Sequence, residues 1–164
     1  MPVRRSSRVI TRSARRKLVW ATLNTGVSVG AGAVKGFDLL GNLETAGASV
    51  LGATVMRTHY QLGLNWNTPV VNDFWCIGQL ICRDVDITTG IDPNTNPGDD
   101  WMLSKQYYVF ATGAAFNIAS YHDIDLKSKR KVQELEQRCG LMVANHSATA
   151  RNVNLYVRTL VALP

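Results

Sequence analysis

The chain has 164 residues, of which 46% are hydrophobic and 18% are charged, and its formal net charge is +6. A chain of this length suffices for one domain with its own core, and this composition excludes a wholly disordered protein. It contains no uncharged apolar run of about 20 residues, so we expect no membrane span and no membrane partner.

The positive charge is concentrated at the N-terminus, where residues 1–17 hold seven basic residues and no acid. This segment has too few apolar side chains to offset the entropy of ordering, and an Arg-rich polycation binds a phosphate backbone without reading its sequence. We therefore predict a nucleic-acid-binding arm at 1–17, disordered unless bound, and a separate folded domain at 18–164. A transit peptide and a solubilising tail are the alternatives. The basic residues of the arm are Arg4, Arg5, Arg8, Arg12, Arg15, Arg16 and Lys17.

Beyond the arm, short apolar runs rich in β-branched and aromatic residues are separated by Gly- and Asn-containing segments, which indicates an all-β domain. The clearest strand is the last one, in which apolar and polar side chains alternate from Val153 to Leu163. The predicted strands are residues 18–24, 26–29 with an extension at 34–40, 50–66, 71–83, 101–110, 117–126, 132–144 and 151–163.

Two connections between these strands carry expectations of their own. A turn at residues 67–69 is predicted to join the third and fourth strands into a β-hairpin. Residues 84–100 are polar and contain two prolines, so we predict a long exposed loop there. A short helix is left open at 42–48 and another at 127–139, where strand is favoured from about Gln137 onward.

Eight short strands predict a single jelly-roll-like antiparallel β-sandwich, with a Greek-key barrel as the alternative. Tryptophans fall at or near predicted strand ends, and we expect most of them in the core and some at contacts between subunits. They are Trp20, Trp66, Trp75 and Trp101.

A second basic cluster lies between the sixth and seventh predicted strands and consists of Lys127, Lys129, Arg130 and Lys131. If it forms a loop on the same side as the arm, it extends the phosphate-binding surface. The alternative is an ordinary solvated loop.

The cysteines and histidines do not indicate a metal site. The cysteines lack a CxxC pair and the histidines lack metal-ligand spacing, so we expect reduced, buried thiols. The acidic loop Asp92–Asp100 has Pro97 and Leu103 where an EF-hand needs Gly and Glu, so a plain turn is favoured. An oxygen-ligand site at a subunit contact is left open. The residues concerned are Cys76, Cys82 and Cys139, and His59, His122 and His146.

Catalytic motifs are also missing from the sequence. The segment Gly30–Gly36 is Gly-rich but lacks the Gly-Lys-Ser/Thr ending of a phosphate-binding loop. We therefore predict that the protein is not an enzyme and takes no cofactor and no small-molecule substrate.

The layout resembles that of short coat proteins of small icosahedral viruses, particularly those with circular single-stranded DNA genomes. The matching features are the Arg-rich arm from Arg4 to Lys17, the series of strands, and the hydrophobic last strand at Leu155–Pro164. The segments Asp99–Met102 and Asp125–Lys131 are also reminiscent of such proteins. Most coat proteins of this kind are longer than this chain.

This resemblance implies a capsid protein that assembles with itself into an icosahedral shell and is located in the virion. The arm then lies inside against the viral genome, single-stranded DNA by the resemblance, and the loop 84–100 lies near the outer surface or a symmetry axis. Two alternatives remain, a small β-barrel nucleic-acid-binding protein and a phage head or tail accessory protein.

Overall fold

The computed structural model describes residues 16–66, 73–95, 102–110, 116–134 and 136–164. These residues form eight strands and two short helices. In chain order they are β1 (Lys17–Val29), β2 (Val34–Asp38), α1 (Gly41–Thr45), β3 (Thr54–Trp66), β4 (Asp73–Arg83), α2 (Asp84–Thr89), β5 (Met102–Phe110), β6 (Phe116–Lys131), β7 (Gln137–Asn145) and β8 (Arg151–Leu163). Neither helix is long and apolar enough to cross a membrane.

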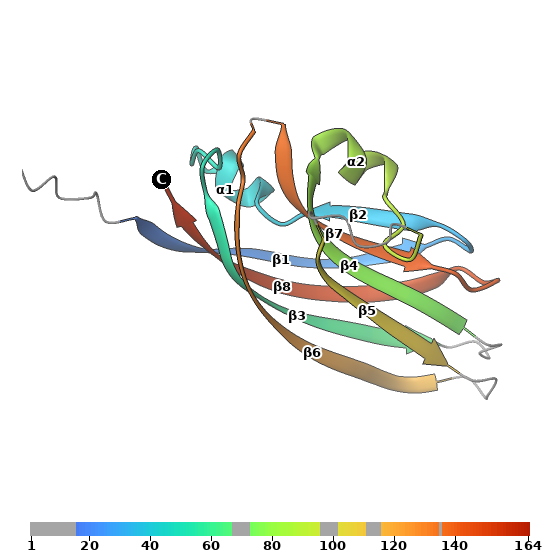
Figure 1. The fold of residues 1–164 in the computed structure, drawn as a ribbon. Helices are drawn as coiled ribbons and strands as arrows, with labels where there is room; N and C mark the ends of the chain where they lie inside the picture. Colours follow the sequence, from blue (N-terminus) through green and yellow to red (C-terminus); the bar gives the residue numbers. More distant parts are fainter. Residues whose placement is uncertain (1–15, 67–72, 96–101, 111–115, 135) are drawn as a thin grey trace, which may run out of the picture.

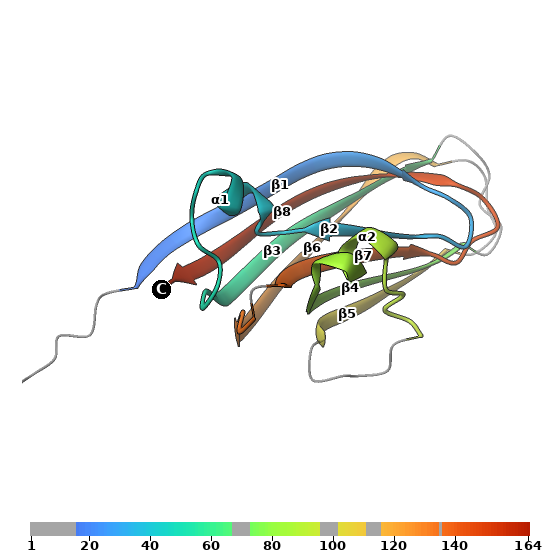
Figure 2. The same cartoon turned by 90° about the horizontal axis from the view of Figure 1, so that it is seen from above.

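The strands pair into two four-stranded antiparallel sheets that stack as a sandwich (Figures 1 and 2). The first sheet has the order β1-β8-β3-β6 and the second sheet has the order β2-β7-β4-β5. Apart from β4 and β5, strands that follow one another in the chain lie in different sheets, which is the arrangement of a jelly roll. The predicted all-β, jelly-roll-like sandwich is therefore confirmed.

The core lies between the two sheets and is built by the alternation that the sequence showed. In β8 every second side chain from Arg151 to Thr159 is buried and those between are exposed. The largest fully buried apolar side chains include Tyr60 of β3, Trp75 and Ile77 of β4, and Leu141 of β7. Successive strand residues point to opposite faces, so this pattern leaves one face of β8 in the core and the other in solvent.

The second sheet is buried on both faces along its two central strands, β4 and β7. Its outer face carries a smaller apolar cluster, in which the connection after β4 packs against the sheet. Gly36 of β2 permits this approach, because a Cβ there would overlap the backbone oxygen of Ile87 in α2. Figure 1 shows α2 beside β2, β7 and β4. The cluster consists of Leu80, Cys82 and Met142, with Val34, Ile87, Ile91 and Met102 packed against it.

The prediction of a long loop at 84–100 was therefore wrong at its beginning, which forms α2. The Asp86 carboxylate accepts hydrogen bonds from the Arg83 backbone N–H (3.2 Å) and from both ends of the Arg83 guanidinium (3.1 Å each). This arrangement closes the first turn of the helix. Ile87 and Ile91 then pack on the second sheet, which explains why a polar-looking segment is held against it.

The predicted hairpin between the third and fourth strands was also wrong. Strand β3 lies between β8 and β6 in the first sheet, whereas β4 lies between β7 and β5 in the second sheet. The reason is visible in β4, whose side chains are buried on both faces and therefore suit the interior of the covered sheet. The turn itself, at residues 67–69, falls outside the described residues.

The weaker sequence predictions had mixed outcomes. The first predicted strand and residues 26–29 form one continuous strand, β1, and the helix left open at 42–48 is present as α1 at Gly41–Thr45. The helix left open at 127–139 was wrong, because β6 extends to Lys131 and β7 begins at Gln137, where strand was favoured.

Candidate nucleic-acid interface

The arm enters the domain at the beginning of β1. Arg16 and Lys17 are exposed there, and the Arg16 Nη1 atom donates a hydrogen bond to the Thr54 Oγ1 atom of β3 at 3.2 Å. The base of the arm is thus held across the first sheet rather than pointing away from it. The other predicted arm residues, Arg4, Arg5, Arg8, Arg12 and Arg15, lie outside the described residues.

The second basic cluster lies at the end of strand β6, so the prediction of a loop was wrong. Lys131 pairs with Thr54, and Arg130 pairs with Val55 of β3. A shift in register follows, with two residues of β6 opposite Met56 before Lys127 pairs with Arg57. The side chains of Lys129, Arg130 and Lys131 are exposed.

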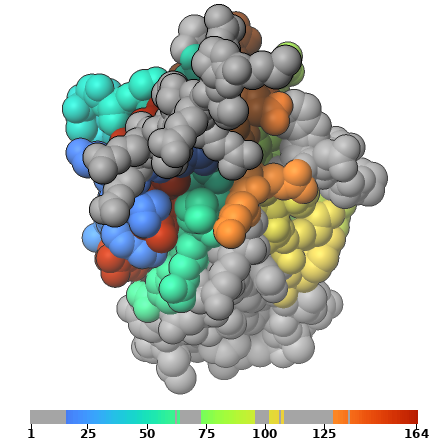
Figure 3. Space-filling model, turned by 60° about the vertical axis from the view of Figure 1, so that its left-hand side comes forward, coloured from blue at the N-terminus to red at the C-terminus, as the bar shows by residue number. Residues whose placement is uncertain are grey.

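The two basic segments meet at one end of the first sheet. Leu18, next to Lys17, pairs with Ala162 of β8, Ala162 pairs with Thr54, and Thr54 pairs with Lys131. Three strand spacings, or about 14 Å, therefore separate β1 from β6, and the Arg16 side chain spans part of that distance. Figure 3 views this end, where the beginning of β1 (blue), the end of β8 (red), β3 (teal) and the orange residues after 128 lie together.

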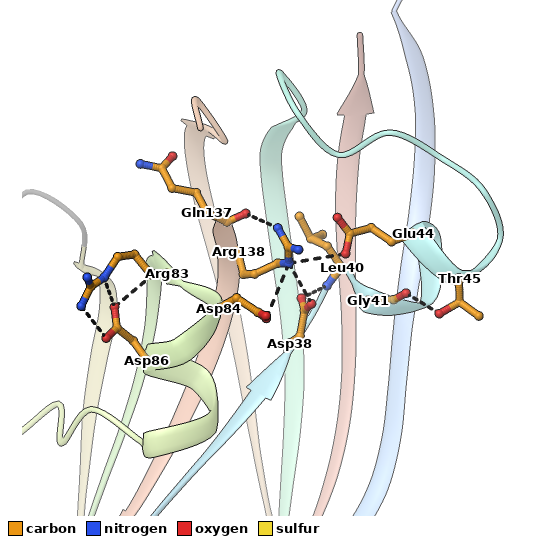
Figure 4. Close-up of polar contacts among 10 residues, drawn as sticks. All are labelled: Asp38, Leu40, Gly41, Glu44, Thr45, Arg83, Asp84, Asp86, Gln137 and Arg138. Atoms are coloured by element: carbon orange, nitrogen blue, oxygen red, sulfur yellow. Dashed lines mark hydrogen bonds and ion pairs between the residues drawn. The ribbon is translucent and has the colours of Figure 1, made fainter. Parts of the chain in front are cut away.

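The second sheet carries a contrasting charge cluster that the sequence did not reveal. The Nε atom of Arg138, in β7, lies 3.4 Å from a carboxylate oxygen of Glu44, 3.7 Å from Asp38 and 3.8 Å from Asp84 (Figure 4). Burial raises the pKa of Asp38, although the Leu40 backbone N–H donates to its carboxylate at 2.8 Å. Three carboxylates around one guanidinium tie β2, α1 and α2 to β7.

Sequence reasoning missed the Arg138 cluster because its members are far apart in the chain and none belongs to a motif. In the described part of the chain, no three His, Cys, Asp or Glu side chains are grouped so that they could hold a metal ion. The described part of the acidic loop is a turn, in which the Asn94 backbone N–H donates to the Asp92 carboxylate at 2.8 Å. Asp99 and Asp100 fall outside the described residues, so the ligand site left open there stays a prediction.

The three cysteines are free and buried, which confirms the expectation of buried thiols. Burial raises the pKa of Cys76 to about 11 and the pKa values of Cys82 and Cys139 to about 12. A protonated, buried thiol is a poor nucleophile and a poor metal ligand. These residues therefore serve as small apolar side chains of the sandwich.

No family model matches the sequence, and no curated protein matches it. Solved viral structures have a similar fold. The capsid protein of BFDV, solved as a decamer, is 8% identical with a TM-score of 0.46, and the match covers 92% of this chain and 100% of that one. The structure of Desmodium yellow mottle tymovirus is 9% identical with a TM-score of 0.47, and the match covers 99% of this chain and 94% of that one. The tobacco streak virus coat protein is 13% identical with a TM-score of 0.45, and the match covers 94% of this chain and 92% of that one. Identities and TM-scores this low describe a likeness of fold and do not establish a function.

Proposed function

We propose that this chain is a capsid protein that assembles with copies of itself into an icosahedral shell and packages a viral genome through its basic arm. It is then a structural protein of the virion, not an enzyme. The observation that carries the proposal is the meeting of Arg16 and Lys17 with Lys131 at one end of the first sheet of a jelly roll.

Charge distribution supports this role. Residues 1–17 hold seven of the 18 basic residues, and the rest of the chain has 11 basic and 12 acidic residues. Subunits gathered into a shell bring their arms together, and these arms repel one another until a polyanion neutralises them. Genome binding therefore favours assembly, while the near-neutral domain lets neighbouring subunits touch without strong repulsion.

The surface of the domain offers material for contacts between copies. Leu51 and Val85 are large apolar side chains exposed in the isolated chain. A small chain suffices for a closed shell because symmetry repeats the same contacts between copies. We propose single-stranded DNA as the genome, in keeping with the layout of the arm and the strands.

The direct test is electron microscopy of the purified full-length protein, with absorbance at 260 and 280 nm measured on the same fraction. We expect uniform closed particles that contain nucleic acid. Small species that bind nucleic acid but form no particles would favour the small binding protein. Rings or small species without nucleic acid would favour the accessory protein, and either result contradicts the proposal.

A deletion of residues 2–15 tests the role of the arm, because it removes five of its seven basic residues and keeps Arg16 with its hydrogen bond to Thr54. The variant is expected to fold, with an unchanged circular dichroism spectrum, and to lose the packaged nucleic acid. The control is Lys35→Glu, which changes an exposed base of β2 in the second sheet. An unchanged nucleic-acid content in the deletion variant would contradict genome packaging by the arm.

A further inference from the structure

The outer face of the first sheet presents an aromatic ring beside the basic end. Trp20 of β1 points away from the core, is 41% exposed and lies under the guanidinium of Arg158, whose Cζ atom is 4.7 Å from the ring centroid. The stacked Arg158 orients the ring and places a positive charge over one of its faces.

The strand register places further cations in line with this pair. A row is the line of residues on this face that pair with one another across neighbouring strands. In the row of Trp20, Trp20 pairs with Leu160, and Leu160 pairs with Arg57, which is exposed. Arg158 lies one row further along, opposite Thr22 and His59. On the other side, Thr54 occupies the row of Leu18, and Arg16, just before β1, donates a hydrogen bond to it, so the face around Trp20 continues into the basic end of the sheet.

Acids are missing from three of the four strands that form this face. The sequences of β1, β3 and β8 contain no Asp and no Glu. In β6, Asp125 pairs with His59 and Asp123 pairs with Gln61. Both positions are three strand spacings, about 14 Å, from β1, and neither lies in the row of Trp20. Asp125 lies in the row of Arg158, two strand spacings or about 10 Å from it.

We infer that this face binds a single-stranded nucleic acid by stacking an unpaired base on the Trp20–Arg158 pair, while Arg57 and the basic end contact the phosphates. This inference rests on the proposed function, because the nucleic acid bound to this face is then the part of the packaged genome that continues beyond the arm. An exposed aromatic ring within a positive surface is how proteins bind single strands without reading their sequence.

Charge favours a nucleic acid over a second copy of this chain as the occupant. Beside Trp20 the face presents Arg57 and Arg158, and a copy docked there through the same face would oppose these cations with its own. A polyanion instead neutralises them. A nucleic acid bound to the arm also reaches this face directly, because the base of the arm, Arg16 and Lys17, lies within two rows of side chains of Trp20.

The test is the affinity of the full-length chain for a labelled oligodeoxythymidine, measured by fluorescence anisotropy at fixed salt, for the wild type and Trp20→Ala. Loss of one stacked base is expected to weaken binding roughly 5- to 100-fold. Trp20→Phe should retain most of the affinity, because it keeps an aromatic ring. A duplex and an abasic strand of the same length should show no Trp20 effect, because neither offers an unpaired base. An oligouridine run in parallel separates DNA from RNA as the preferred strand, and a Trp20 effect on either strand supports the inference.

The matched control is Tyr107→Ala. Tyr107 is 50% exposed and has Lys105 over its ring at 5.9 Å, but it lies on β5 of the second sheet. Its removal should leave the affinity unchanged. If Tyr107→Ala weakens binding as much as Trp20→Ala, the assignment to the first sheet is overturned.

Two other outcomes separate this inference from the proposed function. Wild-type protein that binds the oligonucleotide, with Trp20→Ala binding it equally well, overturns the stacking site and leaves the capsid function standing. Trp20→Ala that loses closed particles but keeps its affinity shows that a second copy occupies the face, and this also overturns the inference. A wild-type chain with no affinity for any strand contradicts the proposed function itself.

Discussion

The outer faces of the two sheets differ in how far they are covered by other parts of the chain. On the second sheet, α2 and the residues after it cover the face, and glycine at position 36 lets the helix backbone approach. On the first sheet, the outward side chains of β1, and those of β8 as far as Arg158, are exposed, among them Leu18, Trp20 and Tyr156. The covered face therefore stabilises the fold, and the outward side chains of the open face remain accessible to solvent.

The largest expected effect compares two leucines that both lie on outer faces. Leu80 of β4 is 3% exposed beneath the α2 connection, and Leu18 of β1 is 61% exposed. Leu80→Ala should lower the free energy of unfolding by about 3 kcal/mol, because it opens a cavity in the covered face. Leu18→Ala should change it by about 0.5 kcal/mol or less. Urea unfolding measures both, and equal effects would show that the two faces do not differ.

A second variant tests the close approach of α2 to the second sheet. Gly36→Ala places a Cβ against the backbone oxygen of Ile87, which cannot move without shifting the helix, so we expect a loss of about 2 kcal/mol in the free energy of unfolding. Gly30→Ala is the control, because its Cβ would meet only the Ala33 side chain at an ordinary 3.5 Å. A Gly36→Ala variant as stable as Gly30→Ala would mean that α2 does not hold this position.

The sequence predicted those parts of the fold that depend on side-chain alternation. The pattern from Val153 to Leu163 predicted β8 and its buried face. It could not predict which strand each one pairs with, because a short connection serves a hairpin and a crossover between sheets equally well. The β3–β4 hairpin was wrong for this reason.

The candidate site was predictable only in part, because charge density is local in sequence and contacts are not. The basic residues of the arm and of β6 form runs, but their meeting at one sheet end depends on the pairing of Thr54 with both Ala162 and Lys131. The contact between Trp20 and Arg158 joins residues from opposite ends of the chain. No spacing rule reveals such a pair.

Thiol labelling examines how firmly the covered face is closed. Burial raises the pKa values of Cys82 and Cys139 to about 12, so both thiols stay protonated at pH 8 and react slowly with iodoacetamide. Cys82 needs only the α2 connection to lift, whereas Cys139 needs the sheets to separate. We expect Cys82 to be labelled roughly tenfold faster, since local opening costs less than global unfolding. Mass spectrometry of the labelled peptides measures both rates.

The chain unfolded in guanidinium is the control for that experiment, because both thiols should then react at the same rate. Equal, slow rates in the folded protein would show that α2 opens only when the whole domain unfolds. In that case the cover is an integral part of the sandwich rather than a local addition to it.

The smallest expected effect concerns charge at the edge of the cover, where Asp38, Glu44 and Asp84 share Arg138. Burial raises the pKa of Asp38 above its ordinary value of 3.8, so the folded chain binds this proton more tightly than the unfolded chain does. The free energy of unfolding contributed by Asp38 therefore falls as pH rises from about 3.8 through the folded-state pKa, and the cost is constant above it. Asp38→Asn removes this cost and keeps an oxygen that accepts from the Leu40 backbone N–H.

We expect Asp38→Asn to be more stable than the wild type by about 0.5 kcal/mol at pH 7, with the difference disappearing toward pH 3. Urea unfolding at a series of pH values gives this difference directly. Asp84→Asn is the matched comparison, since its side chain is 68% exposed and its charge only adds to the rise in the pKa of Asp38, so its replacement should reduce the pH dependence less than Asp38→Asn does. A variant less stable than the wild type at pH 7 would show that the attraction of Asp38 to Arg138 outweighs the cost of burying the carboxylate. The ion pairs of Arg138 would then stabilise the covered edge of the second sheet.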